Sequence, residues 1–304
     1  MRRVGPRSHL VPGLALACAL AACLGGTPSP SPSPSPVTLG PPPVVTTYAP
    51  ATTAWIDGFV VTVQTATASL DEKGGPVAIL VAIRNAGTED AALDAPIQLL
   101  AGEIPFELAR GVELPLIPAG VTSEVRLDFE INGRATIADG VLRIGRPADH
   151  VVSIPLTANP SVLRTLQPRE ATLKAVGSAG SLLAMLRKLQ IRWDLPDWHD
   201  ELPLATEALT ITYDLTYRGL FSGGIAFTAD SIRLRLPDGT VVAPRADGHS
   251  QSIALIPSGK TARGLSSRFE IPDGLTGAFA LVVRNGASQG AISFTIAPTA
   301  SIVP

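Results

Sequence analysis

An alternation of apolar and polar residues with a period of two constrains the fold of this chain more than any other feature. Its clearest runs lie at 124–131, 209–218 and 231–236. Such alternation is typical of β-strands with one buried and one hydrated face. With 45% hydrophobic and 16% charged residues, the chain as a whole is not a disordered polymer. The sequence therefore predicts an all-β fold.

Two halves of this β-rich region look alike. Ile117-Pro118-Ala119-Gly120 precedes a strand over 126–131, and Ile256-Pro257-Ser258-Gly259 precedes one over 267–271. The offset is 139 residues at the first block and 140 at the second, a difference that we expect a loop to absorb. We predict two tandem β-sandwich domains over 53–160 and 168–298. The alternative is that generic β-patterning makes the similarity a coincidence.

One segment has the spacing of a helix instead. Leu182, Met185, Leu186 and Leu189 follow Ser181 at i, i+3, i+4 and i+7. Ser is a good N-cap, and basic residues near the end suit a helix C-terminus. We therefore expect one short helix at the entry to the second domain, packed on the sandwich.

The order of turns and strands resembles the telokin-like, immunoglobulin-fold domain of bacterial surface lipoproteins. It is also similar to the immunoglobulin-like modules of bacterial cell adhesion. The residues that carry the resemblance are 83–87, 116–122 and 127–131 in the first half and 236–239, 255–261 and 269–273 in the second. The second half departs from it, since Tyr217-Arg218-Gly219 stands where Asn-x-Gly is expected. The resemblance implies two immunoglobulin-like (Ig-like) sandwiches and no catalytic residue.

Residues 1–22 have the pattern of a secretory signal peptide. Arg2, Arg3 and Arg7 form a basic start, and an almost wholly apolar stretch follows over 10–22. As a helix this stretch would be about 20 Å long, too short for a bilayer core of roughly 30 Å. We therefore expect export rather than a membrane span.

The signal ends in Leu20-Ala21-Ala22-Cys23, which resembles the bacterial lipobox. The resemblance implies cleavage before Cys23 and a lipid anchor on its thiol, on the extracytoplasmic face of the cell membrane. The alternative is an ordinary signal with an incidental cysteine. Without the three arginines the mature chain has 21 basic and 26 acidic residues, a net charge of −5, which argues against nucleic acid as a partner.

Residues 23–52 are predicted to be a disordered linker. Ser and Pro alternate up to Pro36, and Pro41-Pro42-Pro43 follows. Such a sequence favours the polyproline II conformation and acts as a semi-rigid spacer. The alternative is a ligand for an aromatic groove.

The densest polar cluster is the candidate ligand or metal loop of the second domain. It consists of Asp194, Asp197, Trp198, His199, Asp200 and Glu201. Its oxygen atoms suit Ca²⁺, although the spacing of a calcium loop is missing. A partner site, with Trp198 exposed as a hot spot, and a plain solvated loop are the other interpretations.

Other motifs lend no chemistry. Gly286–Gly290 matches a nucleophile elbow, but no Asp, Glu or His follows it, so we expect a hairpin turn. Gly259-Lys260-Thr261 lacks the rest of a P-loop and precedes a strand. Arg245–His249 is read as a second polar loop, and His150 as a half-exposed residue at the start of a strand. We expect no zinc site and no cofactor.

These observations predict a lipid-anchored, non-enzymatic binding or structural module of the cell envelope, with an unidentified protein or envelope component as its partner. The alternative from another class is an envelope hydrolase, or an accessory subunit, with a site in its loops. A third interpretation is assembly through exposed edge strands.

Overall fold

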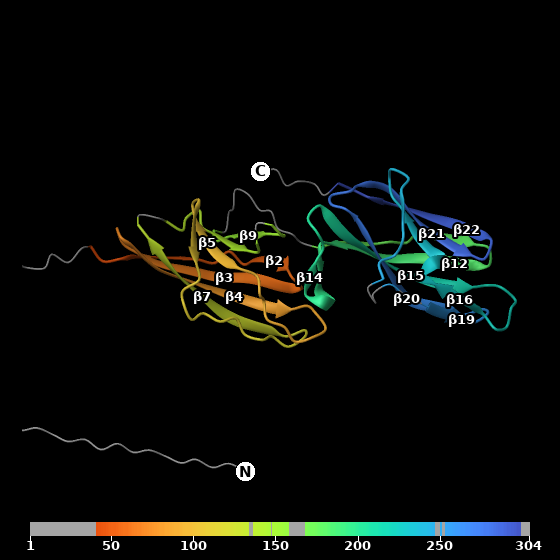
Figure 1. Ribbon diagram of the computed structural model, residues 1–304, viewed down its shortest axis with the longest axis horizontal. Helices are drawn as coiled ribbons and strands as arrows, with labels where there is room; N and C mark the ends of the chain where they lie inside the picture. The colour runs from red at the N-terminus through yellow and green to blue at the C-terminus, as the bar shows by residue number, and fades with distance from the viewer. Residues whose placement is uncertain are drawn as a thin grey trace, which may run out of the picture. The chain divides into compact units, whose positions relative to one another are not determined.

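The computed structural model describes residues 41–133, 136–146, 148–157, 168–246, 250 and 253–298, and it does not describe the side chains of Trp198 and Asp200. The predicted signal peptide, Cys23 and the linker up to residue 40 lie outside the described residues. The described chain forms 22 β-strands and two short 3-10 helices, so the all-β prediction is confirmed (Figure 1). Within these ranges no helix has the length and apolar character needed to cross a membrane.

The first sandwich consists of two antiparallel sheets. One has the order β1-β3-β4-β7, with β2 also pairing with β3, and the other has the order β6-β5-β8-β9. The strands are β1 (Val44–Tyr48), β2 (Thr52–Ile56), β3 (Phe59–Leu70), β4 (Gly74–Asn85), β5 (Ile97–Ala101), β6 (Ile104–Glu107), β7 (Thr122–Asn132), β8 (Val141–Ile144) and β9 (Val152–Pro155).

The second sandwich has sheets of order β10-β12-β15-β20, with β11 also on β12, and β18-β17-β21-β22. Two small pairs, β13–β14 and β16–β19, are added to it. The elements are β10 (Arg169–Thr172), β11 (Val176–Ala179), β12 (Leu182–Arg192), β13 (Asp194–Leu195), η1 (Pro196–Trp198), β14 (Asp200–Glu201), β15 (Thr206–Tyr217), β16 (Ile225–Thr228), η2 (Ala229–Ser231), β17 (Ile232–Arg235), β18 (Val241–Val242), β19 (Ile253–Ile256), β20 (Thr261–Pro272), β21 (Gly277–Asn285) and β22 (Ser288–Ile296).

The two sandwiches repeat one topology. The sheet β3-β4-β7 corresponds to β12-β15-β20, and β6-β5-β8-β9 corresponds to β18-β17-β21-β22. In each copy the first two long strands pair with each other, β3 with β4 and β12 with β15. A third long strand, β7 or β20, pairs with the second of them, and four other strands form the facing sheet. This arrangement is compatible with an Ig-like Greek key.

Each sandwich has its own hydrophobic core, built by the alternation seen in the sequence. In β4, for example, Val77, Ile79, Val81 and Ile83 are buried while the residues between them are more exposed. One core extends from Ala54 to Leu156 and includes Trp193, and the other extends from Ala179 to Ile296.

The one-residue difference between the repeats lies in a strand, not in a loop as expected. Tyr213 pairs with Leu265, but Leu215 pairs with Ala262, so β20 contains one extra residue. Gly264 has φ +67° at this β-bulge and donates its N–H to Asp214 Oδ1 over 3.0 Å. Glycine adopts this backbone conformation without steric cost.

A second bulge occurs at equivalent positions of both copies. The pairing of β3 shifts between Val63 and Thr65, and that of β12 shifts between Leu186 and Lys188. Because bulges are specific features of a fold, their recurrence supports the interpretation of the halves as two copies of one domain.

The predicted helix over 181–189 is wrong, because this segment lies in strand β12. Leu182, Ala184 and Leu186 are buried at a spacing of two, as in any half-buried strand. The extra residue, Arg187, then reverses the alternation and returns Leu189 to the buried face. A bulge thus gave a β-strand the apparent spacing of a helix.

The predicted linker extends too far. Residues 44–48, assigned to it, form β1, which pairs with the end of β3 from Val44↔Leu70 to Tyr48↔Ala66. The Thr47 and Thr67 hydroxyls lie 3.2 Å apart across this pair. Two valines, two threonines and a tyrosine have high β-propensity, so this part of the predicted linker adds a strand to the sheet.

Candidate functional site

The candidate loop of the second sandwich is a short hairpin, here called the 194–201 hairpin. It lies between β12 and β15, and its strands pair through Asp194↔Glu201 and Leu195↔Asp200. Pro196 begins η1, where proline is favoured, and His199 ends it in the left-handed conformation with φ +46°. Figure 1 shows β14 near the ends of β2 and β4.

Trp193 precedes the hairpin and belongs to the core of the first sandwich. Only 5% of its surface is exposed, and its ring stacks on His150 with the centroids 4.4 Å apart. The second sandwich therefore contributes a core residue to the first.

The carboxylate of Asp194 is fully buried and neutralised within the chain. Arg192 donates two hydrogen bonds to it, from Nε and Nη2, each over 2.7 Å. A bidentate pair of this kind satisfies both oxygen atoms and holds the start of the hairpin.

His199 contacts the turn between β2 and β3 of the first sandwich. Its Nδ1 lies 3.0 Å from the main-chain oxygen of Asp57, and its ring lies 4.7 Å from that of Phe59. Because a carbonyl oxygen only accepts, Nδ1 carries the proton. Nε2 is buried and has no hydrogen-bond partner among the described residues.

The first sandwich accommodates the hairpin with two glycines. A Cβ on Gly87 would lie 2.5 Å from both His199 Nε2 and the Pro196 oxygen, and one on Gly58 would lie 2.9 Å from His199 Nδ1. Gly58 also has a positive φ, in the two-residue Asp57-Gly58 turn that joins β2 and β3. Only glycine fits at this approach.

The Asn-x-Gly motif supports this approach from within the first sandwich. Asn85 is buried and donates from Nδ2 to the oxygens of Glu89 and Ile117, over 2.7 and 2.9 Å. Its Oδ1 accepts the N–H of Gly87 over 2.8 Å. The motif therefore fixes the backbone at the position where the hairpin contacts it.

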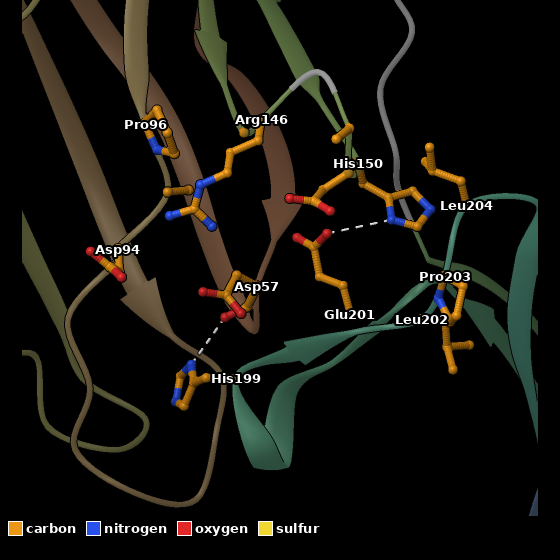
Figure 2. Close-up of a pocket in the computed structure, with 14 residues that line it drawn as sticks. Asp57, Asp94, Pro96, Arg146, His150, His199, Glu201, Leu202, Pro203 and Leu204 are labelled. Atoms are coloured by element: carbon orange, nitrogen blue, oxygen red, sulfur yellow. Dashed lines mark hydrogen bonds and ion pairs between the residues drawn. The ribbon is translucent and has the colours of Figure 1, made fainter.

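A pocket of about 580 Å³ lies beside the hairpin. Its titratable lining residues are Asp57, Asp94, Arg146, Asp149, His150, His199 and Glu201 (Figure 2). His150 Nδ1 lies 3.4 Å from Glu201 Oε2 across it. The guanidinium of Arg146 is directed toward the side that holds Asp57 and Asp94.

His150, predicted as a half-exposed residue at the start of a strand, is partly buried. It lies before β9, and 12% of its side chain is exposed because Trp193 covers its ring. No sequence signal could have paired these two residues, since they come from different domains.

The remaining candidates lie as follows. Asp197 Oδ2 is 3.6 Å from Arg268 Nη2 of the second sandwich, and its main-chain oxygen accepts a 3.5 Å hydrogen bond from Thr88 of the first. In the described part of the chain, no three His, Cys, Asp or Glu residues are grouped as a metal would require.

The rejected motifs have the structures that we expected. Asn285 pairs with Ser288, so the elbow-like sequence is a hairpin turn, and Thr261, the last residue of the P-loop-like sequence, starts β20. Of the second polar loop, Arg245 Nη1 lies 2.9 Å from Glu270 Oε2, while residues 247–249 lie outside the described ranges.

Comparison with models of known protein families finds no match, and a comparison with curated proteins finds none either.

Proposed function

We propose that this chain is a lipid-anchored protein of the bacterial cell envelope that holds two Ig-like sandwiches on a Pro-rich tether. Its role is binding or structural, without catalysis of its own. The lipobox-like sequence before Cys23 and the Ser-Pro alternation up to Pro36 support the anchor and the tether.

One observation carries the structural role: the described polar side chains of the 194–201 hairpin are engaged within the chain. Asp194 binds Arg192, and His199 binds the Asp57 carbonyl of the other sandwich. The hairpin thus acts as a connection between the sandwiches. A connected pair leaves its outer loops to recognise a partner, as loops of such sandwiches commonly do.

The start of the described chain is consistent with this role. It leads into β1, whose Val44 pairs with Leu70 at the end of β3 opposite to Phe59, and Phe59 is the residue that His199 contacts. The described chain therefore begins at the end of the first sandwich away from the hairpin.

Membrane fractionation of cells that produce the full chain tests the proposal. We expect the wild type in the membrane fraction, and the Cys23→Ser variant to be released from it or retained as an uncleaved precursor. Equal membrane attachment and equal processing of both proteins would refute the lipid anchor.

A further inference from the structure

One end of the second sandwich corresponds to the end of the first that receives the hairpin. Tyr217-Arg218-Gly219 begins on the last residue of β15 as Asn85-Ala86-Gly87 begins on the last residue of β4, at an offset of 132 residues. In the first sandwich His199 and Pro196 contact Gly87. In the second, the loop that leads into β16 is exposed at this place.

Four segments meet at this end, which we call the cationic tip: 176–183, 217–224, 257–261 and 284–290. The N–H of Arg218 donates to the Ser181 oxygen over 2.8 Å, and that of Gly259 donates to the Tyr217 oxygen over 2.9 Å. Asn285 Nδ2 donates to the Ala179 oxygen over 3.3 Å. These bonds join the four segments into one surface.

The cationic tip ends in two large apolar side chains. Leu220 is 99% exposed and Phe221 is 67% exposed, in a loop with glycine at 219, 223 and 224. Leu255 of β19 is also 67% exposed. Side chains of this size are seldom left in water without a function when they are grouped.

The charges of the tip are all of one sign. Arg218, Lys260 and Arg284 are exposed there, and none of the four segments contains Asp or Glu. The expected mature chain is acidic, with a net charge of −5, so this end differs in sign from the molecule as a whole.

We propose that the cationic tip binds an anionic lipid surface. Leu220 and Phe221 enter the boundary between headgroups and acyl chains, and the three cations lie against lipid phosphates. Apolar tips flanked by Lys and Arg are the pattern of interfacial binding, and anionic leaflets attract such cations. The proposal is independent of the Cys23 anchor.

The geometry favours a membrane over a different protein and over a second copy of this chain as the partner of the tip. A stable protein interface covers about 800 Å² on each side, whereas the exposed apolar part of the tip consists of a few side chains, Leu220 and Phe221 on one loop together with Val176 and Leu255. The 194–201 hairpin lies between β12 and β15, whose equivalents in the first sandwich are β3 and β4. Only three residues, 71–73, join β3 to β4, so the first sandwich has no such hairpin. The first sandwich of a second copy therefore cannot contact the tip as the hairpin contacts Gly87.

Vesicle co-sedimentation of residues 24–304, which retain every described residue and contain no cysteine, tests the proposal. We expect binding to phosphatidylcholine vesicles that contain phosphatidylglycerol, weaker binding without it, and a decrease with salt. The Leu220→Ser/Phe221→Ser and Arg218→Glu/Lys260→Glu double variants should each bind about tenfold more weakly or worse. Leu116→Ser and Arg110→Glu, at exposed positions of the first sandwich, are the matched controls.

A single labelled cysteine reports insertion directly. A polarity-sensitive dye on Phe221→Cys should shift to the blue with anionic vesicles, and the same dye on Leu116→Cys should not. The proposal is overturned if the wild type binds no vesicles at low salt, if the Leu220→Ser/Phe221→Ser variant binds as well as the wild type, or if phosphatidylglycerol makes no difference. Capture of an acidic protein by a tip that binds no vesicles would assign it to a protein partner instead.

Discussion

His199 donates from Nδ1 to the main-chain oxygen of Asp57 over 3.0 Å, and this bond joins the hairpin of one sandwich to a turn of the other. The contact is kept despite two local costs. His199 has φ +46°, and its Nε2 is buried without a hydrogen-bond partner in the described chain. Such conformations persist only where the surroundings fix them, so the hairpin position is a specified feature of the fold.

Gly87→Ala should loosen this contact. A methyl group there would meet the Pro196 oxygen and His199 Nε2 at 2.5 Å, so we expect a loss of about 1–3 kcal/mol in the free energy of unfolding. Urea unfolding followed by tryptophan fluorescence measures it, since Trp193 lies beside the hairpin. Gly223→Ala is the control, because its methyl group meets only the movable ring of Phe221. Equal stability of the two variants would contradict the close approach.

Arg192→Ala should be among the more destabilising substitutions of a charged residue. It leaves the carboxylate of Asp194, which is fully buried, without its bidentate partner, and we expect a loss of about 3–5 kcal/mol. The Arg192→Ala/Asp194→Ala double variant should recover part of this loss. Chemical denaturation of the wild type, the two single variants and the double variant gives the free energy of coupling between Arg192 and Asp194.

Arg126→Ala is the matched control for that cycle. Arg126 and Asp128 form an ion pair on the surface, with 69% and 42% of their side chains exposed, and surface pairs contribute little. We expect a change within about 0.5 kcal/mol. Equal losses for Arg192→Ala and Arg126→Ala would show that Asp194 does not depend on its partner.

Alkaline pH should destabilise the second sandwich through Tyr213. Burial raises the pKa of Tyr213 to about 12 from 10.0, although the hydrogen bond with Ser267 opposes the shift. The folded state resists ionisation of Tyr213. The contribution of this residue to the free energy of unfolding is therefore fully present below pH 10 and is lost as pH rises from 10 toward 12. Tyr213→Phe should reduce this loss. Denaturant midpoints across this pH range measure it, and identical profiles for the two proteins would contradict the assignment.

Acid should destabilise the bulge of β20 through Asp214. Burial raises the pKa of Asp214, but the N–H of Gly264 and the guanidinium of Arg187 outweigh it, so the pKa lies below its ordinary value of 3.8. The stabilisation is therefore present above pH 4 and is lost as pH falls through the lowered pKa. Asp214→Asn should be less stable near neutral pH and should lack this acid-dependent part. If the free energy of unfolding changed with pH in the same way for Asp214→Asn and the wild type, the assignment to Asp214 would be wrong.

The sequence predicted the fold class because alternation is a local property. The 139 and 140 offsets also pointed to a duplication before any topology was known. Arg187 defeated the same reasoning, since one inserted residue shifts the phase of β12 and imitates a helix. The residues around the candidate site were not predictable, because Asp57, Gly87 and His150 are separated from the hairpin by dozens of residues and lie in another domain.

The intact mass of the mature protein purified from membranes tests whether this is a lipid-anchored envelope protein. We expect a chain that begins at Cys23 and carries the added mass of a diacylglyceryl group, with or without a further acyl chain. A chain with an unmodified Cys23, or one cleaved at another position, would contradict it.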